Sequence, residues 1–263
     1  MIGEVLRFIL FHYCIFIQHR GMGGEFDNMI VVKNMSVSYN GVKAVKRVDI
    51  MVGRGEIHGL LGLNGAGKTT TIKCLVGLLK PDYVEELKVF GINVLSSIEY
   101  RDFIGYLPEY PSLPDYLTPR EFLTYLAKIR HVKTKLKERI DYMLSLFGLD
   151  EVGDKIIVEL SKGLKQRIAL ATVFLHEPRI VILDEPFIGL DPEGQMLVKR
   201  LLSEIINSGG AALISSHMLD TVERLCGKIT IIHKGRTITS GSVKELKNGK
   251  TLEEAFFSII GHA

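Results

Sequence analysis

The chain has 263 residues, of which 46% are hydrophobic and 24% charged, enough for one large α/β domain with a solvated surface. Its net charge of +3 is small and spread along the chain, so the composition does not favour nucleic acid as a partner. The three cysteines stand far apart without a C-x-x-C pair, which argues against a disulfide framework or a zinc site.

The N-terminal residues 1–28 differ from the rest of the sequence. The stretch Val5–Ile17 is strongly apolar, but it contains an arginine and a histidine. It is also shorter than the roughly 20 residues that a membrane-spanning helix needs. We expect residues 1–28 to be an extension outside the folded domain, with translation starting at Met29. An interfacial helix is the alternative.

The next segment, residues 30–61, shows the alternation of apolar and polar side chains that is typical of β-strands. An apolar strand at 57–61 ends this segment and leads into a glycine-rich loop. Helical spacing of apolar residues follows from Thr69 to Leu79. We therefore predict a strand, a loop and a helix in direct succession.

A proline-rich connection comes next, because half of the eight prolines fall between Pro108 and Pro119. Thr118, with a proline after it and Glu121 three positions on, is a typical helix N-terminus. Residues 117–163 are predicted to form a helical insertion. Beyond it, apolar runs at 179–183, 211–215 and 228–232 alternate with helical segments, which predicts a mostly parallel sheet.

The loop at residues 62–69 reads G-L-N-G-A-G-K-T, which matches G-x-x-x-x-G-K-[ST] between a predicted strand and helix. Glycines let backbone N–H groups converge on phosphate oxygens, and the following helix N-terminus favours the same anion. Lys68 can reach the β- and γ-phosphates, and the Thr69 hydroxyl can bind Mg²⁺. The predicted nucleotide contacts in this segment are Gly62, Asn64, Gly65, Ala66, Gly67, Lys68, Thr69 and Thr70.

Two acidic residues, Asp184 and Glu185, end the apolar run at 180–183. Asp184 is placed to hold Mg²⁺, directly or through water, and Glu185 to polarise an attacking water. Two acids at a strand end are by themselves more often simply solvated. The interpretation therefore depends on the motifs around them.

Those motifs are L-S-K-G-L-K-Q-R at 160–167, G-L-D-P at 189–192 and S-S-H at 215–217. Their order and spacing resembles the ATP-binding-cassette ATPases, over essentially residues 30–257. The resemblance implies an α/β fold of the P-loop NTPase class, with a mixed, mostly parallel sheet, an antiparallel β subdomain and a helical insertion. It divides 29–263 into a nucleotide-binding core (29–107 and 164–233), a hinge and helical subdomain (108–163) and a C-terminal tail (234–263).

The resemblance also implies roles for residues in each half of an ATP site. Lys68 and its loop, Asp184, Glu185 and His217 would form one half. In that half Glu185 would be the general base, and His217 would contact the γ-phosphate and orient the water. Tyr39 would stack on adenine; a strand tyrosine packed on the surface is the alternative.

The other half would come from a second chain, with two chains closing head to tail over two ATP molecules. Ser161 and Gly163 would bind the γ-phosphate of the ATP held by the opposite subunit. Asp191 would communicate across that interface.

The sequence departs from the family pattern at two places. Glu109 stands where the family usually has a glutamine; it can still ligate Mg²⁺, but it adds negative charge beside the γ-phosphate. Lys162 and Leu164 replace a glycine and a glutamine of the family ideal L-S-G-G-Q. Lys162 adds a positive charge near the phosphate, while Leu164 loses a side-chain hydrogen bond.

The C-terminal segment and the form of the L-S-K-G-L-K-Q-R motif resemble compact exporter subunits, associated with drug, antibiotic, sodium or polysaccharide efflux. The expectation is an ATP-hydrolysing subunit with ATP and Mg²⁺ as cofactors. It would act at the cytoplasmic face of the cell membrane, as a homodimer, and power export through a separate polytopic permease, with no nucleic-acid partner. The alternatives are a soluble, non-transport cassette ATPase and an importer subunit.

Overall fold

The computed structural model describes residues 27–39, 41–132 and 135–261. Residues 1–26 of the predicted extension 1–28, and with them the alternative of an interfacial helix, lie outside the described part. Asn28, which the prediction placed in the extension, is the first residue of a strand and pairs with Gly53. None of the helices in the described ranges combines the length and the hydrophobicity of a membrane span.

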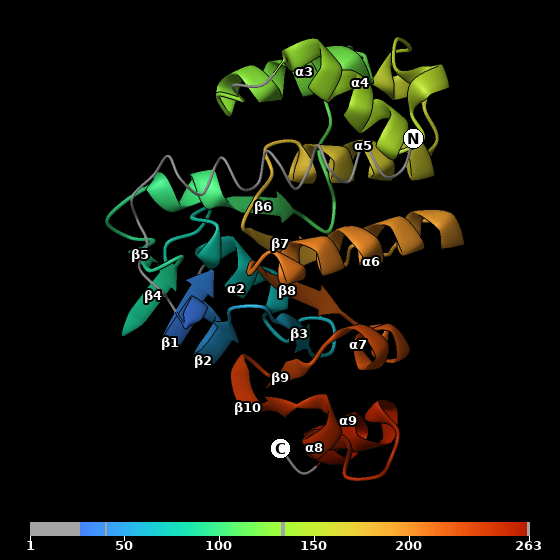
Figure 1. Cartoon of the computed structure of the whole chain (residues 1–263). Helices are drawn as coiled ribbons and strands as arrows, with labels where there is room; N and C mark the ends of the chain where they lie inside the picture. Colours follow the sequence, from blue (N-terminus) through green and yellow to red (C-terminus); the bar gives the residue numbers. More distant parts are fainter. Residues whose placement is uncertain (1–26, 40, 133–134, 262–263) are drawn as a thin grey trace.

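A ten-stranded mixed sheet forms the centre of the molecule, in the order β5-β4-β1-β2-β10-β9-β3-β8-β7-β6 (Figure 1). The strands β9, β3, β8, β7 and β6 are parallel to one another, whereas β1 is antiparallel to both β2 and β4. The predicted mixed, mostly parallel sheet with an antiparallel β region is confirmed. The strands are β1 (Asn28–Tyr39), β2 (Val42–Gly53), β3 (Ile57–Leu61), β4 (Glu86–Val89), β5 (Ile92–Asn93), β6 (Ile104–Leu107), β7 (Ile180–Asp184), β8 (Ala211–Ser216), β9 (Lys228–His233) and β10 (Arg236–Ser242).

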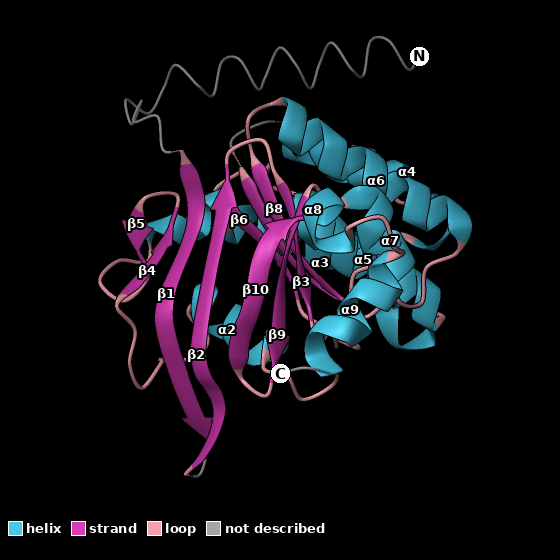
Figure 2. Cartoon of the chain, turned by 90° about the horizontal axis from the view of Figure 1, so that it is seen from below, coloured by secondary structure: helices cyan, strands magenta, loops and turns pink. Residues whose placement is uncertain are grey.

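Helices cover this sheet, most of them beside its parallel part (Figure 2). They are α2 (Lys68–Leu75), α3 (Pro119–Ile129), α4 (Leu136–Leu146), α5 (Lys162–Phe174), α6 (Pro192–Asn207), α7 (Leu219–Leu225), α8 (Val243–Lys247) and α9 (Leu252–Gly261). Short 3₁₀ helices occur at η1 (Glu99–Phe103), η2 (Asp150–Val152) and η3 (Ile157–Glu159).

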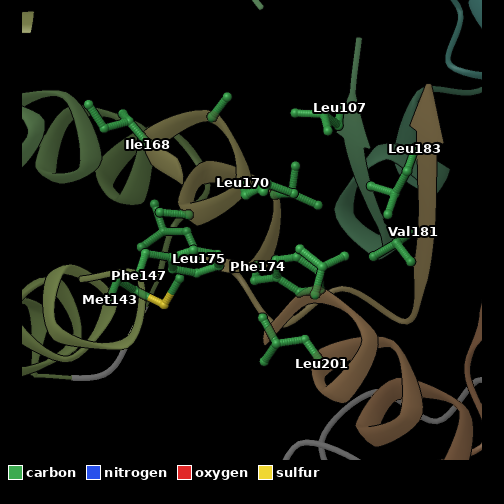
Figure 3. Packing of buried hydrophobic residues seen from close by; sticks show 14 of the residues in the cluster. Leu107, Met143, Phe147, Ile168, Leu170, Phe174, Leu175, Val181, Leu183 and Leu201 are labelled. Atoms are coloured by element: carbon green, nitrogen blue, oxygen red, sulfur yellow. The ribbon is translucent and has the colours of Figure 1, made fainter. Parts of the chain in front are cut away.

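The buried strand β7 separates two apolar cores, because successive side chains of a strand point to opposite faces. Ile180 and Ile182 belong to the core that contains the buried residues of α2, β1 and β2. Val181 and Leu183 belong to the other core, with residues of α5 and α6 (Figure 3). All five residues of β7 are buried, which explains why its sequence is a continuous apolar run rather than an alternating one.

Helices α3 and α4 pack on α5 through the second of these cores. The predicted N-terminus of α3 is confirmed: the Thr118 hydroxyl accepts from the Glu121 backbone N–H, and the Glu121 carboxylate accepts from the Thr118 N–H. Pro119 occupies the first turn, where its missing N–H leaves no hydrogen bond unmade.

The helix after the glycine-rich loop is shorter than predicted, since α2 ends at Leu75 and not at Leu79. Gly77 has a φ of +69°, which is a left-handed conformation that ends a helix. The Leu78 N–H donates to Lys73 O and the Gly77 N–H to Cys74 O, the hydrogen-bond pattern of a Schellman motif. The predicted helix is too long because the spacing of apolar residues continues past Gly77, where the helix has already ended.

Candidate active site

Most of the residues predicted to bind nucleotide gather around one cavity of about 430 Å³. The cavity opens at the carboxyl ends of β3 and β7, where the parallel strands run into loops. It is lined by Tyr39, Ala44, Asn64, Gly65, Ala66, Gly67, Lys68, Thr69, Thr70, Glu109, Tyr110, Asp184 and Glu185. Ala44 and Tyr110 were not among the predicted site residues.

The glycine-rich loop keeps its shape because side chains are missing at two positions. A Cβ on Gly62 would lie 2.5 Å from the carbonyl oxygen of Ile232 in β9. Gly67 has a φ of +107°, a conformation that glycine adopts far more readily than other residues. Gly62 itself does not line the cavity, so its role is to let the loop lie against the sheet.

Lys68 and Thr69 begin α2 at the floor of the cavity. The first turn of α2 contains no acidic residue, so its free N–H groups form an uncompensated positive end suited to phosphate. The ammonium of Lys68 donates to Gly62 O at 2.7 Å and is mostly buried. This bond holds the ammonium within the loop that encloses the cavity.

Asp184 is the residue best suited to hold a divalent cation. It is 1% exposed, and the Ser215 hydroxyl donates to its Oδ1. Its Oδ2 is buried and has no hydrogen-bond partner among the described residues. A buried carboxylate oxygen without a partner is unfavourable unless a cation or water meets it, so the site fits Mg²⁺. The S-S-H motif alone does not indicate that Ser215 binds Asp184, because only the pairing of β7 with β8 brings the two together.

The rest of the site is consistent with Mg²⁺ shared between protein and substrate. No group of three or more histidine, cysteine or acidic side chains in the described part of the chain is arranged as a metal cage. Mg²⁺ is usually bound by one or two carboxylates together with substrate phosphates. Thr69 and Glu109 line the same cavity as Asp184, as their prediction as metal ligands requires.

Tyr106 lies on the neighbouring strand β6, where it pairs with Ile182 of β7. Its hydroxyl is buried and also lacks a hydrogen-bond partner among the described residues. Burial and the negative charge of Asp184 raise the pKa of Tyr106 to about 12, so the phenol stays protonated. It was missed in the sequence because a tyrosine inside an apolar strand carries no site signal.

Glu185 stands at the end of β7 in an unusual backbone conformation, with a φ of +52°. Its N–H is held by the carbonyl oxygen of Ser215 at 3.1 Å and by the Ser215 hydroxyl at 3.2 Å. For a residue with a side chain, the left-handed region costs roughly 1–2 kcal/mol. Strained backbone conformations of this kind are typical of functional sites, where contacts with the surrounding structure hold them in place.

His217 is brought to Glu185 by the adjacent strand β8. Its Nδ1 lies 3.0 Å from Oε1 of Glu185, and its backbone N–H donates to Oε2 at 3.4 Å. His217 does not line the cavity itself, but it contacts a carboxylate that does. The structure thus brings together the predicted general base and the predicted histidine.

Besides Gly62 and His217, three predicted residues do not line the cavity of their own chain: Ser161, Gly163 and Asp191. Ser161 is the N-cap of α5, where its hydroxyl accepts from the Leu164 N–H. Asp191 is the N-cap of α6 and accepts from the Gly194 N–H. Their assignment to the ATP site of a second chain stays a prediction.

Glu109 is accompanied by Tyr110, and the two side chains interact. The hydrogen bond to Glu109 and its negative charge raise the pKa of Tyr110. Tyr110 is 83% exposed, so this interaction lies at the open rim of the cavity.

Fold and cavity together define a P-loop nucleotide hydrolase: a glycine-rich loop and a helix N-terminus face two carboxylates at the ends of parallel strands. Comparison with known proteins gives the family. The family model described as "ABC transporter" matches residues 45–188, more than half of the chain. The chain therefore belongs to the ATP-binding subunits of ABC transporters, and it is an ATPase.

Individual relatives agree with this assignment. The chain is 39% identical to the ABC transporter ATP-binding protein YxlF of Bacillus subtilis, over 83% of this chain and 72% of that protein. It is 38% identical to the bacitracin transport ATP-binding protein BcrA of Bacillus licheniformis, over 86% of this chain and 74% of that protein. A solved ATP-binding subunit of an ABC transporter superposes with a TM-score of 0.82 at 32% identity, covering 88% of this chain and 99% of that one.

These findings confirm the resemblance inferred from the sequence, including its exporter-type relatives, and the predicted fold class and ATPase activity. A solved ATP-binding cassette of the same fold, at 21% identity and a TM-score of 0.75, is a dimer bound to ADP and Pi.

Proposed function

We propose that this chain powers solute export through a separate polytopic membrane permease, acting at the cytoplasmic face of the cell membrane. The relative named for bacitracin transport supports a transport role, because the two chains match over most of both lengths. The proposed ATP hydrolysis is supported mainly by one observation, the contact between Glu185 and His217 beside the phosphate loop.

The proposed hydrolysis uses residues from both ends of the cavity. The phosphate loop and Lys68 bind and orient the β- and γ-phosphates, while Tyr39 receives the adenine ring. Glu185 accepts a proton from the attacking water at its buried carboxylate, and His217 orients that water beside the γ-phosphate.

Thr69, Asp184 and Glu109 would hold Mg²⁺, and the unpartnered Oδ2 of Asp184 supports this. Bound Mg²⁺ supplies charge neutralisation of the phosphates.

The working unit in this proposal is a homodimer closed head to tail over two ATP molecules. Ser161 and Gly163 would complete the site of the opposite chain from the start of α5. Their position outside their own cavity supports the assignment. Residues 108–163 would form the hinge and helical subdomain against which the permease docks.

The dimer is tested with Glu185→Gln, which keeps the side-chain shape but removes the base. With ATP and Mg²⁺ this variant should form a long-lived dimer, because hydrolysis normally opens the pair. Light scattering measures the mass with ATP and, as a control, with ADP. A variant that binds ATP but stays monomeric contradicts homodimeric closure.

Transport is tested by a tagged pull-down from gently solubilised native membranes. A polytopic membrane protein in stoichiometric amount supports a transporter, and its topology separates export from import. Recovery of soluble partners alone would favour the alternative, a non-transport cassette ATPase, and would leave the ATPase activity in place.

A further inference from the structure

Arg167 in α5 connects three segments that meet beside the active site. Its Nη2 donates to both carboxylate oxygens of Asp191, at 2.9 Å each, and its Nη1 donates to Phe147 O at 3.1 Å. Phe147 is the C-cap residue of α4, and Asp191 is the N-cap of α6. The guanidinium therefore joins the end of the helical insertion to the helix that follows the catalytic loop.

The residue that accepts the Arg167 bond at the end of α4, Phe147, is buried in the core. Phe147 is 1% exposed, and its ring stacks with Phe174 of α5 at a centroid distance of 6.2 Å (Figure 3). A Cβ at Gly163, in the first turn of α5, would lie 3.4 Å from Gly189 O. The start of α5 thus packs directly against the loop between β7 and α6 at a second point.

The pair between Arg167 and Asp191 has a defined geometry, although the Asp191 side chain is 52% exposed. The Arg167 side chain is 18% exposed, and one of its guanidinium nitrogens donates to both oxygens of the Asp191 carboxylate. The hydrogen bond from Arg167, followed by that from the Gly194 N–H, lowers the pKa of Asp191. Asp191 is therefore ionised at neutral pH and held from two sides.

The loop that this pair closes begins at Glu185. Its first residue has the left-handed φ of +52°, a conformation that persists where the surrounding structure holds it. Ser215 fixes the first end through two bonds to the Glu185 N–H. Asp191, held by Arg167, fixes the last end.

We propose that Arg167 is a positioning residue for ATP hydrolysis. By holding Asp191, it keeps the loop between β7 and α6 in the conformation that directs the Glu185 carboxylate toward the cavity. This inference rests on the role proposed above for Glu185 as the base. Arg167 lines no part of the cavity, so its effect is on turnover and not on nucleotide affinity.

The test compares Arg167→Met, which keeps the length of the side chain, with Arg167→Lys, which keeps a cation. The matched control is Arg120→Met, which breaks an arginine pair with Asp141 and Asp154 inside the helical insertion. For each variant kcat, KM, the Kd for ATP without hydrolysis and Tm are measured. Arg167→Met should lose about tenfold to a hundredfold in kcat, since displacing a catalytic group by about 1 Å can cost about a hundredfold.

The Kd for ATP should stay within about twofold of wild type, and Arg167→Lys should recover part of kcat. Arg120→Met should keep wild-type kcat. The double variant of Arg167→Met with Asp191→Asn should lose no more than the stronger single variant, because both remove the same contact. A wild-type kcat in Arg167→Met overturns the inference. The inference is also overturned if Arg167→Met loses both Tm and ATP affinity and Arg167→Lys recovers none of the kcat.

Glu185→Gln, measured in parallel, separates this inference from the proposed function. If Glu185→Gln keeps wild-type turnover, Glu185 is not the base, and the inference about Arg167 fails as well. Loss of turnover in Glu185→Gln together with full activity in Arg167→Met overturns the inference alone.

Discussion

Nδ1 of His217 lies 3.0 Å from Oε1 of Glu185, although the Glu185 residue is 7% exposed and the His217 side chain 55%. The two residues end neighbouring strands, β7 and β8, which pair in parallel with Asp184 opposite Ser215. The sheet register therefore places an accessible imidazole beside a buried carboxylate that lines the cavity. An accessible imidazole can contact substrate, and a shielded carboxylate can accept a proton from water held beside it.

The first prediction concerns this pair. His217→Ala should lower kcat by about tenfold to a hundredfold, because in the proposed mechanism the imidazole orients the attacking water. The Kd for ATP should change little, since His217 does not line the cavity. Phosphate release and equilibrium ATP binding measure the two quantities. A variant that loses ATP binding and turnover in parallel would show that His217 acts in substrate binding instead.

Tyr39 gives the second prediction. It lines the cavity and is 42% exposed, so a ring face is available to a base. Tyr39→Ala should weaken ATP binding by about 1–3 kcal/mol, the usual contribution of base–aromatic stacking, whereas Tyr39→Phe should bind normally. Tyr125→Ala, on the exposed surface of α3, is the control. Equal affinities for Tyr39→Ala and wild type would favour the alternative of a surface-packed tyrosine.

Much of the fold could be predicted because apolar runs and turn residues act locally. The strand at 180–183 was found from its continuous hydrophobicity, and the start of α3 from Thr118 and Glu121. The end of α2 was missed because the spacing was extended through Gly77, which adopts a left-handed φ. The order of strands in the sheet depends on long-range pairing, which the sequence pattern does not encode.

The candidate site was predictable where its residues belong to contiguous motifs. The phosphate loop, Asp184 and Glu185 are of this kind, and they line one cavity. Residues that act through contacts between distant segments were missed, since only folding brings them together. Ser215 binds Asp184 across two strands, and Arg167 binds Asp191 across two helices.

The third prediction concerns Glu109, which stands where the family usually has glutamine. The negative charge of Glu109 attracts Mg²⁺ and repels the γ-phosphate. Glu109→Gln removes this charge from the cavity. We expect the Mg²⁺ concentration for half-maximal ATPase to rise by about fivefold, equivalent to about 1 kcal/mol for a partly exposed charge. The affinity for ATP without Mg²⁺ should increase. Magnesium titrations at fixed ATP measure the shift, and an unchanged midpoint would mean that Glu109 does not ligate the metal.

The last prediction concerns the pH dependence of stability, through His176 at the end of α5. Burial, followed by the positive charge of Arg130, lowers the pKa of His176 to about 4 from its ordinary 6.5. Its Nε2 bonds Ile104 O at 2.9 Å, and its Nδ1 is buried without a hydrogen-bond partner among the described residues. Because the folded pKa lies below the unfolded one, the unfolded chain takes up the proton first as the pH falls.

His176 should therefore reduce the free energy of unfolding progressively between pH 6.5 and about pH 4, by about 1–3 kcal/mol. His176→Gln keeps a donor for Ile104 O but cannot take up a proton, so its stability should fall less over this range. His131→Asn, at an exposed position with a φ of +51° that asparagine tolerates, is the control and should follow wild type. Urea unfolding at a series of pH values measures the difference. If His176→Gln and wild type lose stability in parallel from pH 6.5 to pH 4, His176 contributes nothing to the acid sensitivity and other groups must account for it.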